Sequence, residues 1–226
     1  MPVSPYWVFA LFIVIAITLW ILSSVQAKKR TQALEAVAAE IGLNFAGNDQ
    51  SRAIQVRTAL FNKGSSRKFR NIMNGASAGF QASLFDYSYT ISTGRSSSTY
   101  TQTVAAFVQN ISLPLFELRP ENFMHKVSEV FVHRDINFDS HPEFSRRFVL
   151  RGKEEDKIRE LFTPALLTFL EALAPEKKWH IEGSEFTLLL YRAGNTVKSD
   201  EIRTFLDESS LIAQTFFTSC GLRHAK

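Results

Sequence analysis

The stretch GFQASLFDYSYTIS, Gly79 to Ser92, decides the fold because its apolar residues alternate with polar ones from Phe85 onward. Successive side chains of a β-strand point to opposite faces of the sheet, so residues two apart share a face. The period of two therefore predicts a long β-strand. One face carries Phe85, Tyr87, Tyr89 and Ile91, and the other carries Phe80, Ala82 and Leu84.

Two neighbouring stretches extend this strand into a sheet. TYTQTVAAFVQNI, Thr99 to Ile111, is rich in the Thr, Val and aromatic residues that strands favour. KFRNIMN, Lys68 to Asn74, is a shorter stretch that ends at Gly75. Between the two long stretches lies TGRSSS, residues 93–98, a Gly- and Ser-rich segment typical of a hairpin tip. We therefore predict a meander of long antiparallel strands.

The second half of the chain predicts further, shorter strands. LPLFELRPE, residues 113–121, has the composition of a short strand, and we expect a helix to follow it over residues 122–131. FSRRFVLRG, residues 144–152, predicts another strand that ends at a glycine. KWHIEGSEFTLLLYR, residues 178–192, predicts a β-hairpin that turns at Gly183-Ser184.

Helical periodicity predicts the other elements of the domain. Thr163-Pro164 either kinks one of these helices or begins a second one, with Thr163 as N-cap and Pro164 at the first helical position. A run of antiparallel strands followed by helices indicates an α+β fold. The expected helical segments are residues 28–41, 50–60, 153–173 and 199–219.

The first 27 residues, Met1 to Ala27, contain no charged side chain. A helix needs about 20 mostly apolar residues to cross the ~30 Å hydrocarbon core of a bilayer, and Tyr6 to Gln26 has that length. Trp7 and Trp20 lie near its two ends, where interfacial aromatic residues are common. A buried core helix is rarely apolar around its whole circumference. The segment therefore predicts a transmembrane helix.

The basic residues Lys28, Lys29 and Arg30 follow this segment at once. Positive charge beside a membrane helix favours the cytoplasmic side, so we expect a single-pass protein of the cell (inner) membrane with its C-terminal domain in the cytoplasm. The alternative is a signal peptide cleaved after Val25–Ala27, although its start lacks a basic region. An uncleaved anchor is the preferred interpretation, and the membrane-flanking cluster would contact lipid headgroups.

The chain divides into three predicted parts. Residues 1–27 form an outside tail and the transmembrane helix, residues 28–45 a juxtamembrane helix, and residues 46–226 a soluble α+β domain. This domain is expected to contain a long-stranded antiparallel sheet with packed helices. No Pro-, Gly- or charge-rich linker marks a second domain boundary.

The charge balance argues against a nucleic-acid-binding surface. The sequence has 26 basic and 22 acidic residues, and removing the three membrane-flanking basic residues leaves 23 against 22. A nucleic-acid-binding domain would need a basic stripe of its own. Cys220 is the single cysteine, which excludes an intramolecular disulfide and a cysteine-rich zinc site. No cofactor is indicated.

One loop carries candidate metal ligands. His133, Asp135, Asp139 and His141 offer nitrogen and oxygen donors suited to zinc, iron or manganese, but Asp, Asn, Ser and Pro are also ordinary turn residues. His133-Arg134-Asp135 resembles the start of a kinase catalytic loop, yet Ser140 occupies the position where that loop needs Asn. No catalytic residue is indicated elsewhere. Asp86 is expected to be a polar strand residue on the solvent-facing side.

Several stretches resemble an uncharacterised family of bacterial single-pass membrane proteins, with a domain of unknown function. They are FDYSYT (85–90), TQTV (101–104), LPLFELRPE (113–121) and INFDSHPEFSRRFVLRGKEEDKIRELF (136–162). The resemblance covers most of the chain after the anchor and implies a location in the bacterial cytoplasmic membrane. It implies no established activity and no functional residues.

Two functions follow as hypotheses. The first is a non-enzymatic, membrane-tethered domain that binds a protein partner or a membrane component beside the cytoplasmic leaflet, where tethering raises its effective concentration. The alternative is a metal-dependent hydrolase built on the loop from His133 to His141, in which the metal would activate water. A lipid-binding domain is a third hypothesis that rests on fold analogy alone.

Overall fold

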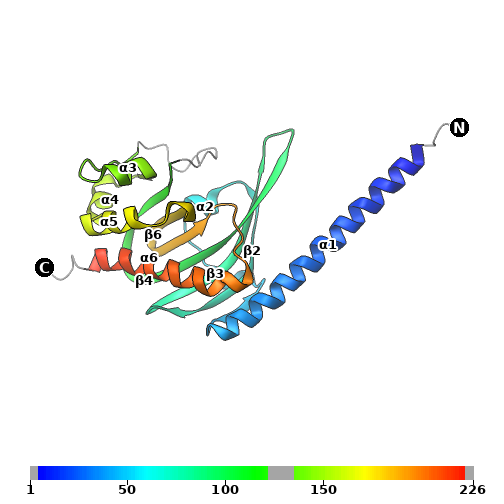
Figure 1. Ribbon diagram of the computed structural model, residues 1–226, viewed down its shortest axis with the longest axis horizontal. Coiled ribbons are helices and arrows are strands. Elements are labelled where there is room, and N and C mark those ends of the chain that lie inside the picture. The colour runs from blue at the N-terminus through cyan, green and yellow to red at the C-terminus, as the bar shows by residue number, and fades with distance from the viewer. Residues whose placement is uncertain (1–4, 122–134, 222–226) are drawn as a thin grey trace.

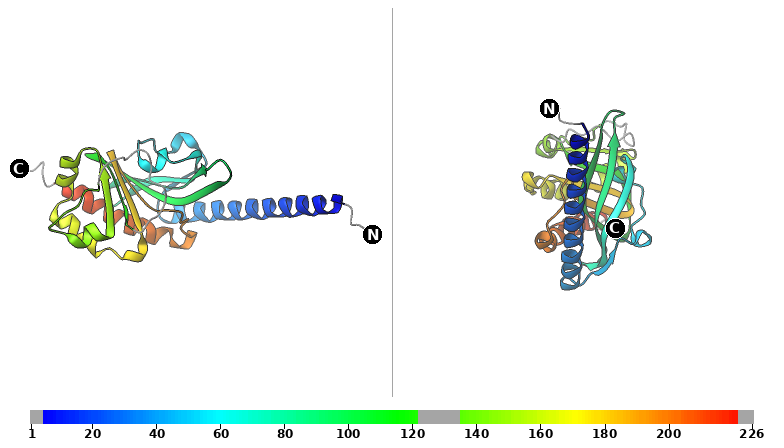
Figure 2. Two further views of the ribbon diagram at one scale, coloured as in Figure 1. Left: turned by 90° about the horizontal axis from the view of Figure 1, so that it is seen from above. Right: turned by 90° about the vertical axis from the view of Figure 1, so that its right-hand side faces the viewer.

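The computed structural model describes residues 5–121 and 135–221. It confirms the α+β prediction, because one long helix, α1 (Pro5–Glu40), projects from a domain that combines a six-stranded antiparallel sheet with shorter helices (Figure 1). The N-terminal half of α1 stands clear of the domain, whereas its C-terminal end lies against the sheet (Figure 2).

Helix α1 joins the predicted anchor and the predicted juxtamembrane helix without a break. No Gly or Pro occurs between residues 6 and 40, so nothing in the sequence interrupts the helical hydrogen bonds. At 1.5 Å per residue its 36 residues span ~54 Å. Gly42, with φ +75°, ends the helical segment, since glycine adopts this left-handed conformation without steric cost. Leu34 and Ala38 are buried in the domain core.

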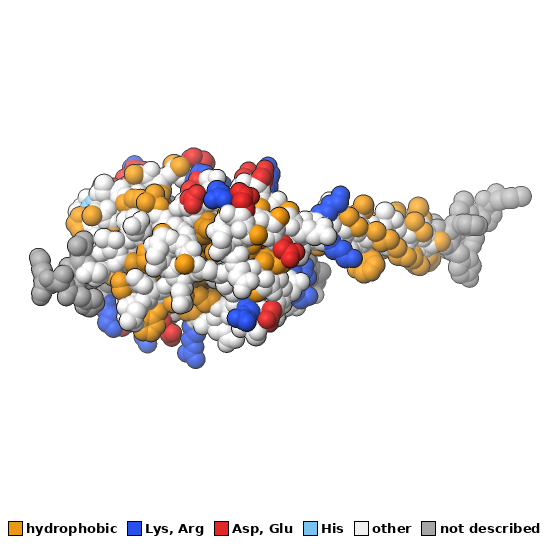
Figure 3. All heavy atoms as spheres, turned by 90° about the horizontal axis from the view of Figure 1, so that it is seen from below, with side chains coloured by type: hydrophobic (Ala, Val, Ile, Leu, Met, Phe, Trp, Pro, Cys, Tyr) orange, Lys and Arg blue, Asp and Glu red, His pale blue; other side chains and the backbone are white. Residues whose placement is uncertain are grey.

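The N-terminal part of α1 is exposed, unlike the C-terminal part that packs on the domain. Its large apolar side chains are exposed from Phe9 to Val25, and Trp20 is 70% exposed. Within the described residues, α1 is the one helix that is both long enough and apolar enough to cross a membrane. Its most apolar 18-residue stretch is not buried against the rest of the protein. Figure 3 shows this hydrophobic surface bordered by Lys and Arg side chains where the helix meets the domain. A core helix would bury such a surface.

The sheet is built around one very long strand. Strand β4 pairs with β3 through its first half and with β5 through its last residues, and β6 pairs along most of its other edge. Strands β2 and β1 continue the sheet beyond β3. The strands are β1 (Asn44–Gly47), β2 (Ser65–Ser77), β3 (Phe80–Ser92), β4 (Ser97–Pro120), β5 (Phe148–Gly152) and β6 (Trp179–Arg192).

The predicted hairpin between the two long strands is confirmed. Ser92 of β3 lies opposite Ser97 of β4, so residues 93–96 form the tip. LPLFELRPE is not a separate strand but the end of β4. Pro114 lies where the register with β6 shifts between Leu113 and Phe116, and such an irregularity tolerates a residue without an N–H donor. The helix predicted over residues 122–131 lies outside the described residues.

The hairpin predicted at Gly183-Ser184 is wrong, because both residues lie within the single strand β6. Gly183 lies opposite Phe116, and a Cβ atom there would come within 2.2 Å of the Phe116 ring. The glycine therefore permits close packing of a side chain, not a turn. Glu185, with φ +54°, lies at the irregular part of this pairing and bends the strand without reversing it.

The helical predictions are met in part. Thr163 caps a new helix, since its side chain accepts a hydrogen bond from the Leu166 N–H, so the second of the two alternatives at Thr163-Pro164 is correct. FSRR belongs to a helix that begins at Pro142, and the strand begins only at Phe148. The helix predicted over residues 50–60 is reduced to a 3-10 turn and α2. The helices are α2 (Ala59–Asn62), α3 (Pro142–Arg147), α4 (Glu155–Leu161), α5 (Pro164–Ala172) and α6 (Ile202–Gly221), with 3-10 turns at Gln50–Arg52, Pro175–Lys177 and Ser199–Glu201.

The sheet buries both of its faces. The larger core packs α6, the other C-terminal helices and the end of α1 on one face, with Phe116 and Phe216 stacked at its centre. The smaller core lies under α2 and the segment before it, around Phe85 and Tyr87. Coverage on both faces explains why β3 carries apolar residues on both of its sides.

Candidate functional site

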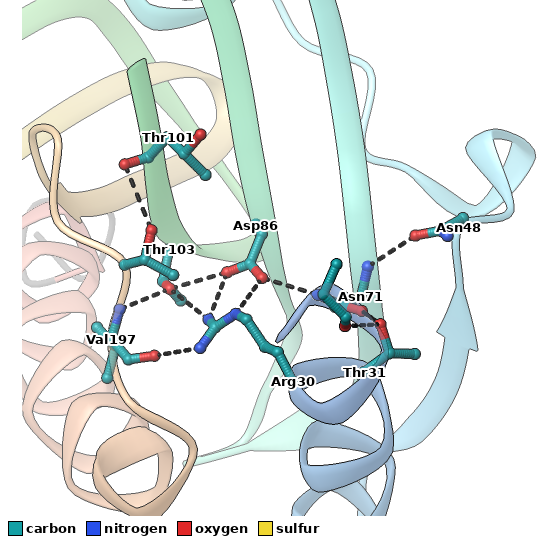
Figure 4. Close-up of polar contacts among 10 residues, drawn as sticks. Arg30, Thr31, Asn48, Asn71, Asp86, Thr101, Thr103 and Val197 are labelled. Atoms are coloured by element: carbon teal, nitrogen blue, oxygen red, sulfur yellow. Dashed lines mark hydrogen bonds and ion pairs between the residues drawn. The ribbon is translucent and has the colours of Figure 1, made fainter. Parts of the chain in front are cut away.

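A buried polar cluster joins α1 to the sheet, and we call it the helix–sheet joint: Arg30, Thr31, Asn71, Asp86, Thr103 and Val197 (Figure 4). Arg30 Nε and Nη2 each donate to one carboxylate oxygen of Asp86, both at 2.7 Å. The Asp86 side chain is 7% exposed and that of Arg30 is 23% exposed. A paired guanidinium–carboxylate contact of this geometry is among the strongest hydrogen-bonded ion pairs.

The remaining acceptor capacity of Asp86 is also used. Asn71 Nδ2 donates to it at 2.8 Å and Thr103 Oγ1 at 3.0 Å. Asn71 has φ +52° and lies in a bulge of β2, which turns its side chain toward the carboxylate (Figure 4). Thr31 Oγ1 donates to the side-chain oxygen Oδ1 of Asn71 at 2.8 Å, so a second residue of α1 enters the cluster.

The helix–sheet joint also holds the segment before α6. Arg30 Nη1 donates to the carbonyl oxygen of Val197 at 2.8 Å, and the Val197 N–H donates to Thr103 Oγ1 at 3.0 Å. The Asp86 carboxylate thus receives four hydrogen bonds while its side chain is almost fully buried. Its chemistry is that of a structural tie, not of a general base.

The joint shows that one sequence prediction is wrong and that Arg30 has a contact the sequence did not indicate. Asp86 does not face solvent, because α1 covers that face of the sheet. Arg30 is taken into the joint, whereas Lys28 and Lys29 remain exposed on the helix surface. Sequence reasoning could not pair Arg30 with Asp86, since 56 residues separate them.

A second buried carboxyl group, Glu182 of β6, lies on the other side of β4. It is 1% exposed and accepts hydrogen bonds from the Leu60 N–H at 3.0 Å and from the Tyr191 hydroxyl at 2.6 Å. Glu117 of β4 lies opposite it in register, and Lys63 Nζ lies 3.5 Å from the Glu117 carboxylate. Burial, followed by the charge of Glu117, raises the pKa of Glu182 to about 7.

An open cavity of about 630 Å³ lies between the segment before α2 and the adjacent strands, and we call it the aromatic trough. Its floor consists of Phe61, Phe69 and Tyr87, whose ring centroids lie 4.9–5.1 Å apart. Ile54 and Val56 form part of its rim. The Tyr87 hydroxyl is buried and makes no hydrogen bond with any residue that the structure describes. Burial raises the pKa of Tyr87, so this hydroxyl stays protonated and can donate.

The candidate metal ligands do not form a group in the described part of the chain. Asp135 pairs with Arg151 at 2.6 Å, and His141 Nδ1 lies 3.0 Å from Ser140 Oγ just before α3. Asp139 is exposed, and His133 lies outside the described residues. Across residues 5–121 and 135–221, no three His, Cys, Asp or Glu side chains are placed to hold a metal ion. The four-residue site stays a prediction that depends on His133.

Comparison with known proteins adds one finding. No protein-family model matches the sequence, and no curated protein matches it. Among solved structures, the fold is similar to the crystal structure of the mycobacterial trehalose monomycolate transport factor A, TtfA. The TM-score is 0.59 at 13% sequence identity, and the match covers 84% of this chain and 93% of TtfA. At this identity the likeness shows a shared fold alone.

Proposed function

We propose that this chain is a single-pass, membrane-anchored binding protein whose domain faces the cytoplasm beside the inner membrane. The observation that carries the proposal is the division of α1. Its outer part exposes apolar residues from Phe9 to Val25, whereas Leu34 and Ala38 of the same helix are built into the domain core. Lys28 and Lys29 lie between the two parts, and positive charge at that position favours the cytoplasmic side.

The aromatic trough is the proposed contact for a membrane-proximal protein partner. Its volume lies in the range of pre-formed binding sites, which are lined mainly by apolar and aromatic side chains. Apolar side chains of a partner segment would pack on Phe61, Phe69 and the neighbouring Ile54 and Val56. Aromatic residues in such a setting often dominate binding energy. An anchored domain meets such a partner at high effective concentration.

Three further points support an accessory role of this kind. The fold neighbour TtfA is named as a transport factor, which fits a protein that assists others in the membrane. The resemblance to bacterial single-pass membrane proteins fits the inner-membrane location. The polar clusters described above are occupied by internal ion pairs and hydrogen bonds.

The partner site is tested by photo-crosslinking in intact cells. A photoreactive amino acid replaces Val56 at the rim of the trough, and a matched variant carries it at Gln81, an exposed residue at the opposite end of β3. We expect a discrete membrane-protein adduct from position 56 that position 81 does not give. If both positions give the same adducts, or neither gives one, the trough is not the partner site.

The orientation is tested separately. A reporter that works only in the cytoplasm, fused after Lys226, should be active, and the mature chain should retain residues before Lys28. Activity only of a periplasmic reporter, or a mature chain that begins at Lys28, would contradict the anchored, inward-facing arrangement.

A further inference from the structure

We infer that the domain touches the bilayer a second time, through the β3–β4 hairpin and the basic end of the sheet, and that this surface recognises anionic phospholipid headgroups. The inference rests on the proposed membrane anchor. We call this surface the basic sheet end. It comprises the exposed side chains of Lys28, Lys29, Arg67, Lys68, Arg70 and Arg95.

The first argument is position. The β3–β4 hairpin and the N-terminal half of α1 leave the domain on the same side, as both views of the fold show (Figures 1 and 2). The helix–sheet joint fixes the two elements to each other through Arg30 and Asp86. A helix anchored in a bilayer therefore brings the hairpin toward the same bilayer surface.

The second argument is reach. From Asp86, β3 continues for six residues to Ser92, which corresponds to ~20 Å at about 3.3 Å per residue. On α1, Arg30 lies three residues beyond Ala27, the end of the uncharged segment, which corresponds to ~4.5 Å. The hairpin is thus several times longer than the stretch of helix that separates the joint from the hydrocarbon. Because the hairpin runs at an angle to α1 (Figure 1), only part of its length is directed along the helix, and it is long enough for the tip to reach the headgroup layer.

The third argument is charge. The pairs Ser65↔Thr90 and Lys68↔Ser88 place the first residues of β2 beside the outer part of β3. Residues 65–70 and 87–101 contain four basic residues and no acidic one, although the chain has 22 acidic residues. Adding Lys28 and Lys29 gives six basic residues at the end of the domain that faces the anchor. Clusters of Lys and Arg next to a membrane segment attract anionic lipids.

The fourth argument is the chemistry of the tip. Thr93, Gly94, Arg95 and Ser96 are polar, and residues 92–99 are exposed. An arginine is costly in hydrocarbon but stable among phosphate groups, with which its guanidinium forms paired hydrogen bonds. The tip therefore fits the headgroup layer and not the acyl chains.

The test uses the full chain with Cys220→Ala, reconstituted in nanodiscs of phosphatidylcholine or of phosphatidylcholine with phosphatidylglycerol. Single cysteines carry a spin label whose exposure to a water-soluble nickel quencher is measured. Ser96→Cys reports the hairpin tip, and Gln81→Cys, at the other end of β3, is the matched control. Ile15→Cys reports the membrane anchor independently.

We expect the label at position 96 to be several-fold less exposed than that at position 81 in phosphatidylglycerol discs. The protection should weaken at high salt and in the double variant Lys68→Glu/Arg95→Glu, because headgroup attraction is screened or reversed. Equal exposure at positions 96 and 81, with position 15 protected, would overturn the inference and leave the anchor intact. If the label at position 96 were equally protected in both lipids, the proposal that this surface recognises anionic headgroups would be overturned. Exposure at position 15 would overturn both proposals.

Discussion

Asp86 and Glu182 are both buried in the sheet, but their surroundings differ. Asp86 faces the guanidinium of Arg30 and receives two further neutral donors. Glu182 receives only neutral donors, from Leu60 and Tyr191, and lies near a second acid, Glu117. Asp86 therefore has a matching positive charge beside it, whereas burial and the charge of Glu117 favour the protonated form of Glu182.

The difference shows how each group contributes to the molecule. A buried ion pair costs much desolvation free energy, and it is tolerated where the geometry satisfies every donor and acceptor. At the helix–sheet joint the Arg30–Asp86 ion pair fixes α1 to the domain. At Glu182 the carboxyl group caps the start of α2 through the Leu60 N–H and retains the ability to titrate. The helix–sheet joint therefore holds α1 against the sheet, whereas the stability contributed by Glu182 depends on pH.

The largest expected effect is at the joint. Arg30→Met leaves Asp86 buried without its positive partner, and breaking such a pair typically costs about 3–5 kcal/mol, with partial exposure of Arg30 favouring the lower end. We expect a loss of about 3 kcal/mol in the free energy of unfolding, measured by urea denaturation of the full chain in detergent. Lys29→Met is the matched control and should change stability by less than about 0.5 kcal/mol. Similar values for both variants would show that the joint contributes little.

The next largest effect is a pH dependence of the free energy of unfolding that arises from Glu182. Its folded-state pKa is about 7 against an ordinary value of 4.5, so the folded protein binds the proton more tightly. Stability from this group is then highest at low pH and is lost as pH rises from 4.5 through 7. Glu182→Gln removes this loss, so the stability of the variant relative to the wild type should rise by about 2.5 kcal/mol between pH 5 and pH 8.

The measurement for this prediction is urea denaturation of both proteins at several pH values. Asp86→Asn serves as the contrast, because it leaves the Arg30 guanidinium without its counter-charge and should destabilise the protein at both pH values. A difference between Glu182→Gln and the wild type that stays constant with pH would contradict an elevated pKa for Glu182.

The smallest effect concerns one hydrogen bond of Glu182. Tyr191→Phe removes the hydroxyl that donates to it at 2.6 Å, while the ring that stacks on His180 remains. We expect a loss of about 1–2 kcal/mol at pH 8, where the acceptor is charged, and a smaller loss at pH 5. The same denaturation series tests this, and a loss that is larger at pH 5 would reverse the assignment of the charged acceptor.

Features that depend on neighbouring residues could be predicted from the sequence. The alternation around Phe85 defined β3, residues 93–98 indicated the hairpin, and Thr163-Pro164 offered the correct helix start as one of two alternatives. In each case the decisive signal lies within a few residues, because strand alternation, turns and helix caps are local.

Features that depend on distant residues could not be predicted. Gly183 has the local signature of a turn, but its conformation is decided by the ring of Phe116 on another strand. Asp86 has the signature of a solvent-facing residue until α1 is placed over it. The aromatic trough combines Phe61, Phe69 and Tyr87 from three separate elements, and no sequence spacing relates them.

The absence of any break in α1 couples the orientation of its exposed apolar part to that of the domain. A flexible linker would let the domain tumble freely, but a continuous helix tied at Arg30 makes both parts turn together. Apolar helices lean further in thinner bilayers, since leaning matches their length to the hydrocarbon. If α1 is anchored as proposed, a change in bilayer thickness would tilt the whole domain and alter which neighbouring membrane proteins it can contact.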